Sequence, residues 1–196
     1  METLILVFAG SLRTGAFSEK TADVAQLELA RGGATVTRLS LADYPLPLMN
    51  EDLEREEGLP DAAMQLARQF MAHDGVLIAS PEYNASIPPL LKNALDWVSR
   101  VRADGDRKVQ PYADRPFALC SSSPGAFAGM RGLYHLRAVL MACGAEVITP
   151  QCSVSHAARA FDEEGAFVEE RVHKQMQGVC QALIARAQAL STRTYG

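Results

Sequence analysis

The chain has 196 residues, of which 48% are hydrophobic and 21% are charged, and its formal net charge at pH 7 is −4. This composition is that of a globular protein and excludes a disordered or fibrous one. Charges of both signs are spread along the chain, so a basic surface for nucleic acid is not expected. Because no Gly/Ser linker, Pro-rich spacer or internal repeat divides the sequence, residues 1–196 are predicted to form a single domain.

The N-terminal stretch METLILVFAGSLR lacks a basic region, and its apolar run is too short for a signal sequence or a membrane span. The four cysteines form no C-x-x-C pair, and three of them lie in apolar segments, which is typical of reduced, buried thiols. We therefore expect a cytoplasmic protein with no membrane insertion. The acidic run Glu51–Glu57 is expected to be a solvated loop or face.

Short apolar runs alternate with segments of helical periodicity along the chain. The predicted strands are Thr3–Ala9, Val36–Leu41, Val76–Ala79, Phe117–Cys120 and Glu146–Thr149. Helices are predicted around Glu19–Ala30 and, from their apolar stripes, in the segments 62–71, 90–101, 133–143 and 168–190.

Five strands that are each followed by a helix predict an α/β three-layer sandwich, with a parallel sheet between two layers of helices. The strand count favours the flavodoxin-like order 2-1-3-4-5 over a six-stranded dinucleotide-binding fold. In such folds ligands bind beyond the carboxyl ends of the strands, where the strand order reverses. Here that point lies between the first and the third strand.

The loop after the first strand, GSLRTGAFS, suits a phosphate group. It offers hydroxyls on Ser11, Thr14 and Ser18, the guanidinium of Arg13 and the N–H groups at the start of a helix. Ser18 is also predicted to cap that helix. The alternative is a Gly/Ser-rich turn with a surface arginine. Neither G-x-x-x-x-G-K-[ST] nor G-x-G-x-x-G occurs here, so a P-loop NTPase and a Rossmann-type NAD site are not expected.

The loop after the third strand begins the stretch SPEYNASIPPLLKNALDW. Tyr83 supplies a flat ring with a hydroxyl, and the amide of Asn84 can both donate and accept hydrogen bonds. Ser86 is a candidate N-cap for the next helix, and Pro88 or Pro89 fits its first turn. The alternative is a tight strand-to-helix turn whose tyrosine packs against the core.

The loop after the fourth strand, SSSPGAFAGMRG, is rich in serine and glycine, which leaves its backbone open to a flat ligand. The alternative is a flexible surface loop. The predicted fold places all three loops at the same sheet edge. A molecule with a terminal phosphate and a flat ring with polar edges would use all three, and FMN is such a molecule.

The segments GSLRTGAFS, SPEYNASIPPLLKNALDW and SSSPGAFAGMRGLYHLR resemble those of the NAD(P)H-dependent FMN reductases, a group of flavodoxin-like quinone, chromate and azo-dye reductases. The resemblance spans Leu4–Pro150. It implies phosphate contacts in the first loop, largely backbone contacts to the ring in the second, and contacts to the other side of the ring in the third. The cofactor-binding residues that it implies are Ser11, Arg13, Phe17, Ser18, Pro81, Glu82, Tyr83, Asn84, Ser122, Ser123 and Gly125.

The sequence departs from this family in two segments. The third loop reads Ala128-Gly129-Met130-Arg131, where the family often has two glycines before the arginine, and the alanine and the methionine are expected to alter the pocket wall or a subunit interface. The polar segment Arg102–Arg115 is expected to border the substrate entrance.

The resemblance implies an oxidoreductase that passes hydride from NADPH or NADH through FMN to quinone-like acceptors, flavins, azo dyes or chromate in a ping-pong scheme. The flavin carries the chemistry, so no catalytic side chain and no metal site are expected. A homodimer or homotetramer is also implied. Two alternatives are a flavodoxin-like electron carrier, although carriers are usually more acidic than −4, and a non-catalytic FMN-binding protein.

Overall fold

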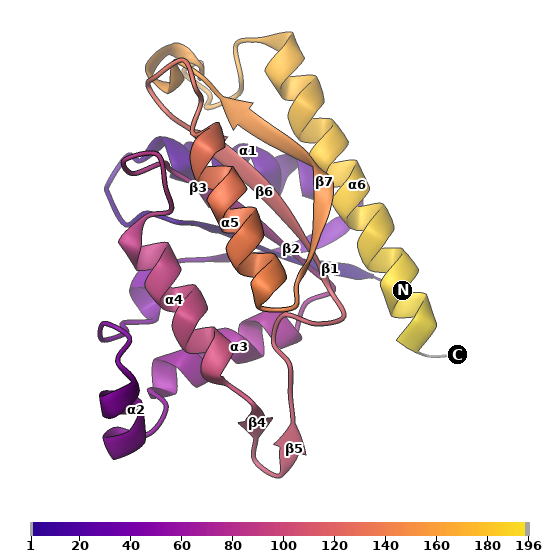
Figure 1. Ribbon diagram of the computed structural model, residues 1–196. Helices are drawn as coiled ribbons and strands as arrows, with labels where there is room; N and C mark the ends of the chain where they lie inside the picture. The colour runs from indigo at the N-terminus through magenta and orange to yellow at the C-terminus, as the bar shows by residue number, and fades with distance from the viewer. Residues whose placement is uncertain (1, 195–196) are drawn as a thin grey trace.

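The computed structural model describes residues 2–194 as three layers with a five-stranded sheet in the middle (Figure 1). The strands of this sheet are β1 (Thr3–Ala9), β2 (Ala34–Leu39), β3 (Gly75–Ser80), β6 (Pro116–Ser122) and β7 (Glu146–Val154). They are parallel and lie in the order β2-β1-β3-β6-β7. Since β6 and β7 are the fourth and fifth strands of the sheet, the predicted flavodoxin-like order 2-1-3-4-5 is confirmed.

Helices cover both faces of the sheet (Figure 1). One face packs against α1 (Phe17–Arg31) and α6 (Glu170–Thr194), and the other against α3 (Asp61–Met71), α4 (Pro89–Arg100) and α5 (Met130–Ala142). The remaining elements are η1 (Leu41–Asp43), α2 (Glu51–Glu57), the hairpin of β4 (Ala103–Asp104) and β5 (Arg107–Lys108), and η2 (Ala157–Arg159). The acidic α2 has no buried residue, so its predicted solvation is confirmed.

Strand β1 shows why its sequence is almost continuously apolar. Ile5 and Val7 belong to the core beneath α1 and α6, whereas Leu6 and Phe8 belong to the core beneath α3, α4 and α5. Successive side chains of a strand point to opposite faces. A strand buried on both faces therefore needs apolar residues at every position.

The strands that carry the three predicted loops end at the same edge of the sheet. In register, Ala9 pairs with Ala79 and Ser80 pairs with Ser121. The backbone N–H of Gly10 then donates to the carbonyl of Ala79 at 2.9 Å. The loops after β1, β3 and β6 consequently begin side by side, at the left and upper left of Figure 1.

Several predicted boundaries were wrong. The second strand covers Ala34–Leu39 and not Val36–Leu41, because the hydroxyl of Ser40 accepts a hydrogen bond from the backbone N of Ala42 and starts η1. The fifth strand continues past Thr149 to Val154, and its pairing with β6 shifts register there. Pro150, which has no N–H to donate, is tolerated because β7 lies at the edge of the sheet.

Three further predictions about helix ends were also wrong. Ser18 does not cap α1, because the helix begins one residue before it, at Phe17, and Ala16 takes the N-cap position. Ser86 does not cap α4, whose N-cap is Pro88. Val168 does not belong to the stripe of α6, since it precedes that helix and is 62% exposed.

The segment Arg102–Arg115 lies at the edge of the sheet opposite the three loops. It follows the end of α4 and leads directly into the first residue of β6, and its hairpin projects at the bottom of Figure 1. Within this chain it therefore does not border the predicted site, because a connection that leads into a parallel strand starts at the amino-terminal edge.

None of the helices within residues 2–194 is long and apolar enough to cross a bilayer. Within the same residues, no group of three or more His, Cys, Asp or Glu side chains is arranged to hold a metal ion.

Candidate functional site

A cavity of about 180 Å³ opens between the loops that follow β1, β3 and β6. Every cofactor-binding residue expected from the sequence lines it except Asn84 and Gly125. Two residues that the sequence did not single out, Ala16 and Pro124, complete its wall. The full lining is Ser11, Arg13, Ala16, Phe17, Ser18, Pro81, Glu82, Tyr83, Ser122, Ser123 and Pro124.

The first loop presents hydrogen-bond donors and a cation to this cavity. The N-cap residue Ala16 supplies no side-chain oxygen, and in the 15-residue helix α1 its carbonyl accepts from the N–H of Glu19 at 3.0 Å, which leaves the N–H groups of Phe17 and Ser18 without a capping side chain. The exposed guanidinium of Arg13 makes only 3.4 Å contacts, to the carbonyls of Thr14 and Gly15, and lies 5.9 Å from the ring centroid of Phe17. Uncapped helical N–H groups next to an arginine suit a phosphate.

Two buried hydroxyls in the cavity lining have no hydrogen-bond partner. They are Ser18 Oγ in α1 and Ser122 Oγ at the end of β6, and within residues 2–194 they share this property only with Arg115 Nε. A buried hydroxyl without a partner costs about 1–3 kcal/mol. Because these two come from different walls of one cavity, a polar ligand placed between the walls would satisfy both. FMN, with phosphate and ring atoms that accept hydrogen bonds, fits this donor set.

The second loop contains a tight turn at Tyr83–Ser86. The backbone N of Tyr83 donates to the carbonyl of Ser86 at 3.0 Å, and the backbone N of Ser86 donates to the carbonyl of Tyr83 at 2.9 Å. The central residues Asn84 and Ala85 have φ angles of 49° and 63°. Positive φ at both central positions is typical of a type I′ turn, and asparagine tolerates it well. Asn84 is therefore an exposed turn residue outside the cavity, whereas the half-exposed Tyr83 lines it.

Glu82 lines the cavity but its carboxylate is already bound by the protein. It accepts hydrogen bonds from Nε of Arg131 at 3.0 Å and from the backbone N of Gly132 at 3.1 Å. Burial of Glu82 opposes its ionisation, but the hydrogen bonds from Arg131 and Gly132 and the positive charge of Arg131 outweigh it and hold the pKa of Glu82 below its usual value. This carboxylate is thus an ionised link between the second loop and α5.

The third loop is fixed to the rest of the sheet. Ser121 Oγ donates to the carbonyl of Ala128 at 2.8 Å. The backbone N of Ser123 donates to the carbonyl of Val154 in β7, and the backbone N of Ala157 donates to the carbonyl of Ser123, both at 3.0 Å. These bonds hold both ends of the loop, whose residues 124–127 are exposed, and the segment after β7 supports the site through Ala157.

Ala128 and Gly129 occupy the positions in the third loop where the family often has two glycines. Ala128 has a φ of 57° and Gly129 a φ of 79°, so both adopt the left-handed conformation that glycine adopts most easily. The methyl group of Ala128 is buried at the base of the third loop.

Cavity size alone would point to a different part of the molecule. Cavities of about 610 and 360 Å³ lie at the opposite edge of the sheet, around the segment Arg102–Arg115 and the end of α5. The cavity of about 180 Å³ between the three loops is nevertheless the better candidate for a flavin. It lies where the strand order reverses and contains the two unsatisfied hydroxyls.

Comparison with known proteins gives one consistent family. The family model described as NADPH-dependent FMN reductase matches residues 3–159. An NAD(P)H-dependent FMN reductase of Pseudomonas aeruginosa is 34% identical over 181 residues, which cover 91% of this chain and 92% of that protein. A quinone reductase of Escherichia coli K12 is 39% identical over 145 residues, 74% of this chain and 72% of that protein. The solved structure of FerB, an NAD(P)H:acceptor oxidoreductase of Paracoccus denitrificans, has a TM-score of 0.77 at 26% identity and covers 95% of this chain and 98% of its own.

A flavodoxin-like sheet with a phosphate-suited loop after its first strand is compatible with a flavin-binding protein. Because the family model covers most of the chain and the relatives exceed 30% identity over most of its length, the chain belongs to the NADPH-dependent FMN reductase family. It is an oxidoreductase whose cofactor is FMN and whose reductant is NAD(P)H.

Proposed function

We propose that this enzyme oxidises NADPH or NADH and reduces quinone-like acceptors, including flavins, azo dyes and chromate, in a ping-pong order. The observation that carries the proposal is the pair of unsatisfied hydroxyls, Ser18 and Ser122, in one cavity at the carboxyl edge of the sheet. The relative from E. coli that is named a quinone reductase supports the choice of acceptor.

In this proposal the first loop holds the FMN phosphate. Arg13 and the N–H groups of Phe17 and Ser18 at the start of α1 supply positive charge and donors, and Ser18 adds a hydroxyl from the same helix. Ser11 has a supporting role, because its Oγ accepts a hydrogen bond from the backbone N of Arg13 at 3.2 Å and fixes the shape of the loop.

The second and third loops hold the flavin ring. Pro81 and Tyr83 form one wall and Ser122 and Ser123 the other, and Glu82 keeps the two loops together through Arg131. When bound, FMN supplies the two-electron chemistry of hydride acceptance and donation. The protein supplies the position of the ring and of the reactants. NAD(P)H and the acceptor are proposed to use the same side of the site in turn.

The test is an anaerobic titration of the FMN-loaded protein with NADPH or NADH, followed by steady-state assays with a panel of quinones, free flavins, azo dyes and chromate. Bleaching of the flavin absorbance and parallel double-reciprocal plots are expected. If the protein binds flavin but neither nucleotide bleaches it, an electron carrier is the better assignment. Turnover no faster than that of free FMN would indicate a non-catalytic flavin-binding protein.

We also propose that the protein is a cytoplasmic homodimer or homotetramer with the flavin site near an interface. Three aromatic side chains on the second loop, the third loop and α5 are well exposed: Tyr83 at 48%, Phe127 at 61% and Tyr134 at 57%. Exposed aromatic residues that gather on neighbouring elements are typical of interaction surfaces. Light scattering of the wild type and of Phe127→Ser tests this assembly, and a monomeric wild type would contradict it.

A further inference from the structure

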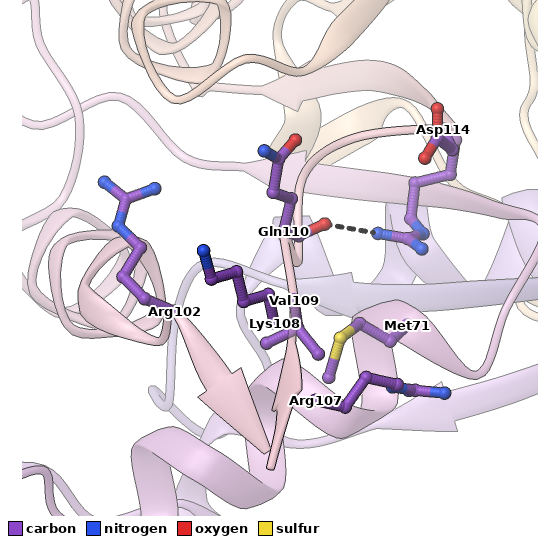
Figure 2. Close-up of a pocket in the computed structure, with 8 residues that line it drawn as sticks. Met71, Arg102, Arg107, Lys108, Val109, Gln110 and Asp114 are labelled. Atoms are coloured by element: carbon purple, nitrogen blue, oxygen red, sulfur yellow. Dashed lines mark hydrogen bonds between the residues drawn. The ribbon is translucent and has the colours of Figure 1, made fainter. Parts of the chain in front are cut away.

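The cavity of about 610 Å³ at the amino-terminal edge of the sheet has a different chemical character from the flavin site (Figure 2). It lies around the hairpin of β4 and β5, beside the end of α3. We call it the basic pocket, and its lining residues are Met71, Arg102, Arg107, Lys108, Val109, Gln110, Asp114 and Arg115.

The basic pocket carries an excess of positive charge on an acidic protein. Arg102, Arg107, Lys108 and Arg115 are cationic, Asp114 is the only carboxylate of the lining, and the whole chain has a net charge of −4. Figure 2 shows Arg102, Arg107 and Lys108 around the hairpin, with the side chains of Arg102 and Arg107 on opposite sides of it. A concave surface lined by one sign of charge concentrates counter-ions.

These four cations differ from most others in the protein because they have no ion-pair partner. In the part of the chain that the structure describes, the arginines that form ion pairs are Arg31, Arg38, Arg55, Arg68, Arg100, Arg131, Arg171 and Arg186. None of the four cations of the basic pocket forms one within residues 2–194. The nearby Asp104 accepts from Arg68, through bonds of 3.0 and 2.6 Å, and after Arg68 the charge of Arg107 also helps to lower the pKa of Asp104.

Of the four cations, Arg115 is the one with a buried nitrogen that has no hydrogen-bond partner. This nitrogen is Nε, whereas Nη1 of the same side chain donates to the carbonyls of Pro111 and Gln110. Desolvation lowers the pKa of its guanidinium in spite of the charges of Asp114 and Asp74. Its hydrogen-bond partners are carbonyl groups, and the charges of Asp114 and Asp74 do not outweigh its desolvation, so a bound anion would add compensation.

The lining also contains apolar side chains that could contact an organic group attached to the anion. Met71 and the buried Val109 give the pocket an apolar wall next to the cations. Its volume lies in the range of small-molecule sites and exceeds what a lone phosphate requires. Guanidinium groups bind phosphate oxygens through paired, charge-assisted hydrogen bonds. We propose that the basic pocket binds a phosphorylated small molecule, at a site separate from the flavin cavity.

The test uses FMN-saturated protein, so that the flavin phosphate site is filled, and isothermal titration calorimetry at constant ionic strength. The probes are inorganic pyrophosphate, inorganic phosphate, ribose 5-phosphate and, as the uncharged control, ribose. We expect pyrophosphate and ribose 5-phosphate to bind with a Kd below about 1 mM, ribose 5-phosphate to bind more tightly than inorganic phosphate, and ribose not to bind.

Arg102→Gln and Lys108→Gln test the pocket itself, because both side chains are exposed and their replacement is compatible with the fold. Each is expected to weaken binding by about tenfold and to leave FMN content unchanged. Lys174→Gln is the matched control, since it removes one exposed positive charge from α6 and should change the Kd by less than about twofold.

Three results would overturn the proposal. The first is no heat of binding at about 10 mM pyrophosphate. The second is equal weakening by Lys174→Gln, which would show a general charge effect. The third is binding of a single-stranded oligonucleotide that Arg102→Gln weakens and that displaces ribose 5-phosphate, which would assign the basic pocket to nucleic acid.

Discussion

Glu82 and Arg131 connect two of the three loops around the flavin cavity. The carboxylate of Glu82 accepts from Nε of Arg131 at 3.0 Å, and its side chain is only 6% exposed. The guanidinium of Arg131 also lies 4.8 Å from the ring centroid of Phe127 in the third loop. One carboxylate thus holds the second loop against α5, and its partner arginine reaches the third loop.

Replacement of Glu82 by glutamine is expected to destabilise the protein in a pH-dependent way. At pH 7 the loss of the charged partner should lower the free energy of unfolding by about 1–2 kcal/mol, because Arg131 is half-exposed and part of the interaction is screened. The pKa of Glu82 is lower in the folded state than its ordinary value of 4.5. Its stabilisation is therefore fully present above pH 4.5 and is lost as the pH falls through the lowered pKa.

Urea denaturation followed by circular dichroism at a series of pH values measures this effect. The difference between the wild type and Glu82→Gln should be largest at neutral pH and should shrink below pH 4.5. Glu57→Gln in the exposed helix α2 is the control and should show little difference at any pH. A difference that stays constant down to acid pH would show that the ionisation of Glu82 does not contribute.

Ser18→Ala is expected to change stability and flavin affinity in opposite directions. Without flavin, the variant loses a buried hydroxyl that has no partner, so the apoprotein should be as stable as the wild type or more stable by up to about 1 kcal/mol. With flavin, the loss of a hydrogen bond to the phosphate should raise the Kd for FMN about tenfold. Thermal unfolding of the apoprotein and fluorescence titration with FMN measure the two effects.

Binding of riboflavin, which lacks the phosphate, distinguishes the proposed roles of the Ser18 and Ser122 hydroxyls. Ser18→Ala should leave the Kd for riboflavin unchanged, whereas Ser122→Ala should weaken riboflavin and FMN by the same factor. The reason is that Ser18 belongs to the phosphate end of the cavity and Ser122 to the wall proposed for the ring. If both variants weakened both flavins equally, the proposed orientation of FMN would be wrong.

Arg13→Gln is expected to weaken FMN binding selectively. Its guanidinium has no ion pair in residues 2–194, so its charge is available to a phosphate. Loss of a charge-assisted contact should raise the Kd for FMN by about tenfold or more and should make it less sensitive to salt. Arg55→Gln, which removes an exposed charge from α2, is the control. An unchanged salt dependence in Arg13→Gln would contradict a phosphate contact.

The sheet and the three loops could be predicted because each depends on a local pattern. A strand buried on both faces must be apolar at successive positions, as β1 is, and the carboxyl ends of parallel strands meet at one edge. The boundaries were less predictable because they depend on single hydrogen bonds. The bond from Ala42 to Ser40 and the start of α1 at Phe17 leave no clear signal in the sequence.

The supporting contacts of the site were the least predictable part. Glu82 and Arg131 are 49 residues apart, and a glutamate and an arginine in two polar loops look like solvated charges until the fold brings them together. The same holds for the segment after β7, whose bond from Ala157 to Ser123 supports the third loop through backbone atoms alone. Sequence patterns report which side chains are present, but such contacts depend on the tertiary structure.

Gly129→Ala is expected to destabilise the third loop for two separate reasons. Its φ of 79° is strained for any residue with a side chain, and a Cβ there would lie 3.0 Å from Cβ of Ser121. Gly144→Ala isolates the first reason, since Gly144 has a φ of 89° but no atom within 4 Å of the added Cβ. Strain alone should lower the free energy of unfolding by about 1 kcal/mol, and the collision should add about 1–3 kcal/mol in Gly129→Ala.

Urea denaturation of both variants measures the difference, and FMN titration should show weaker binding only in Gly129→Ala. Equal destabilisation of the two would mean that Ser121 moves aside without cost and that the close approach of the third loop to β6 is not required for the site.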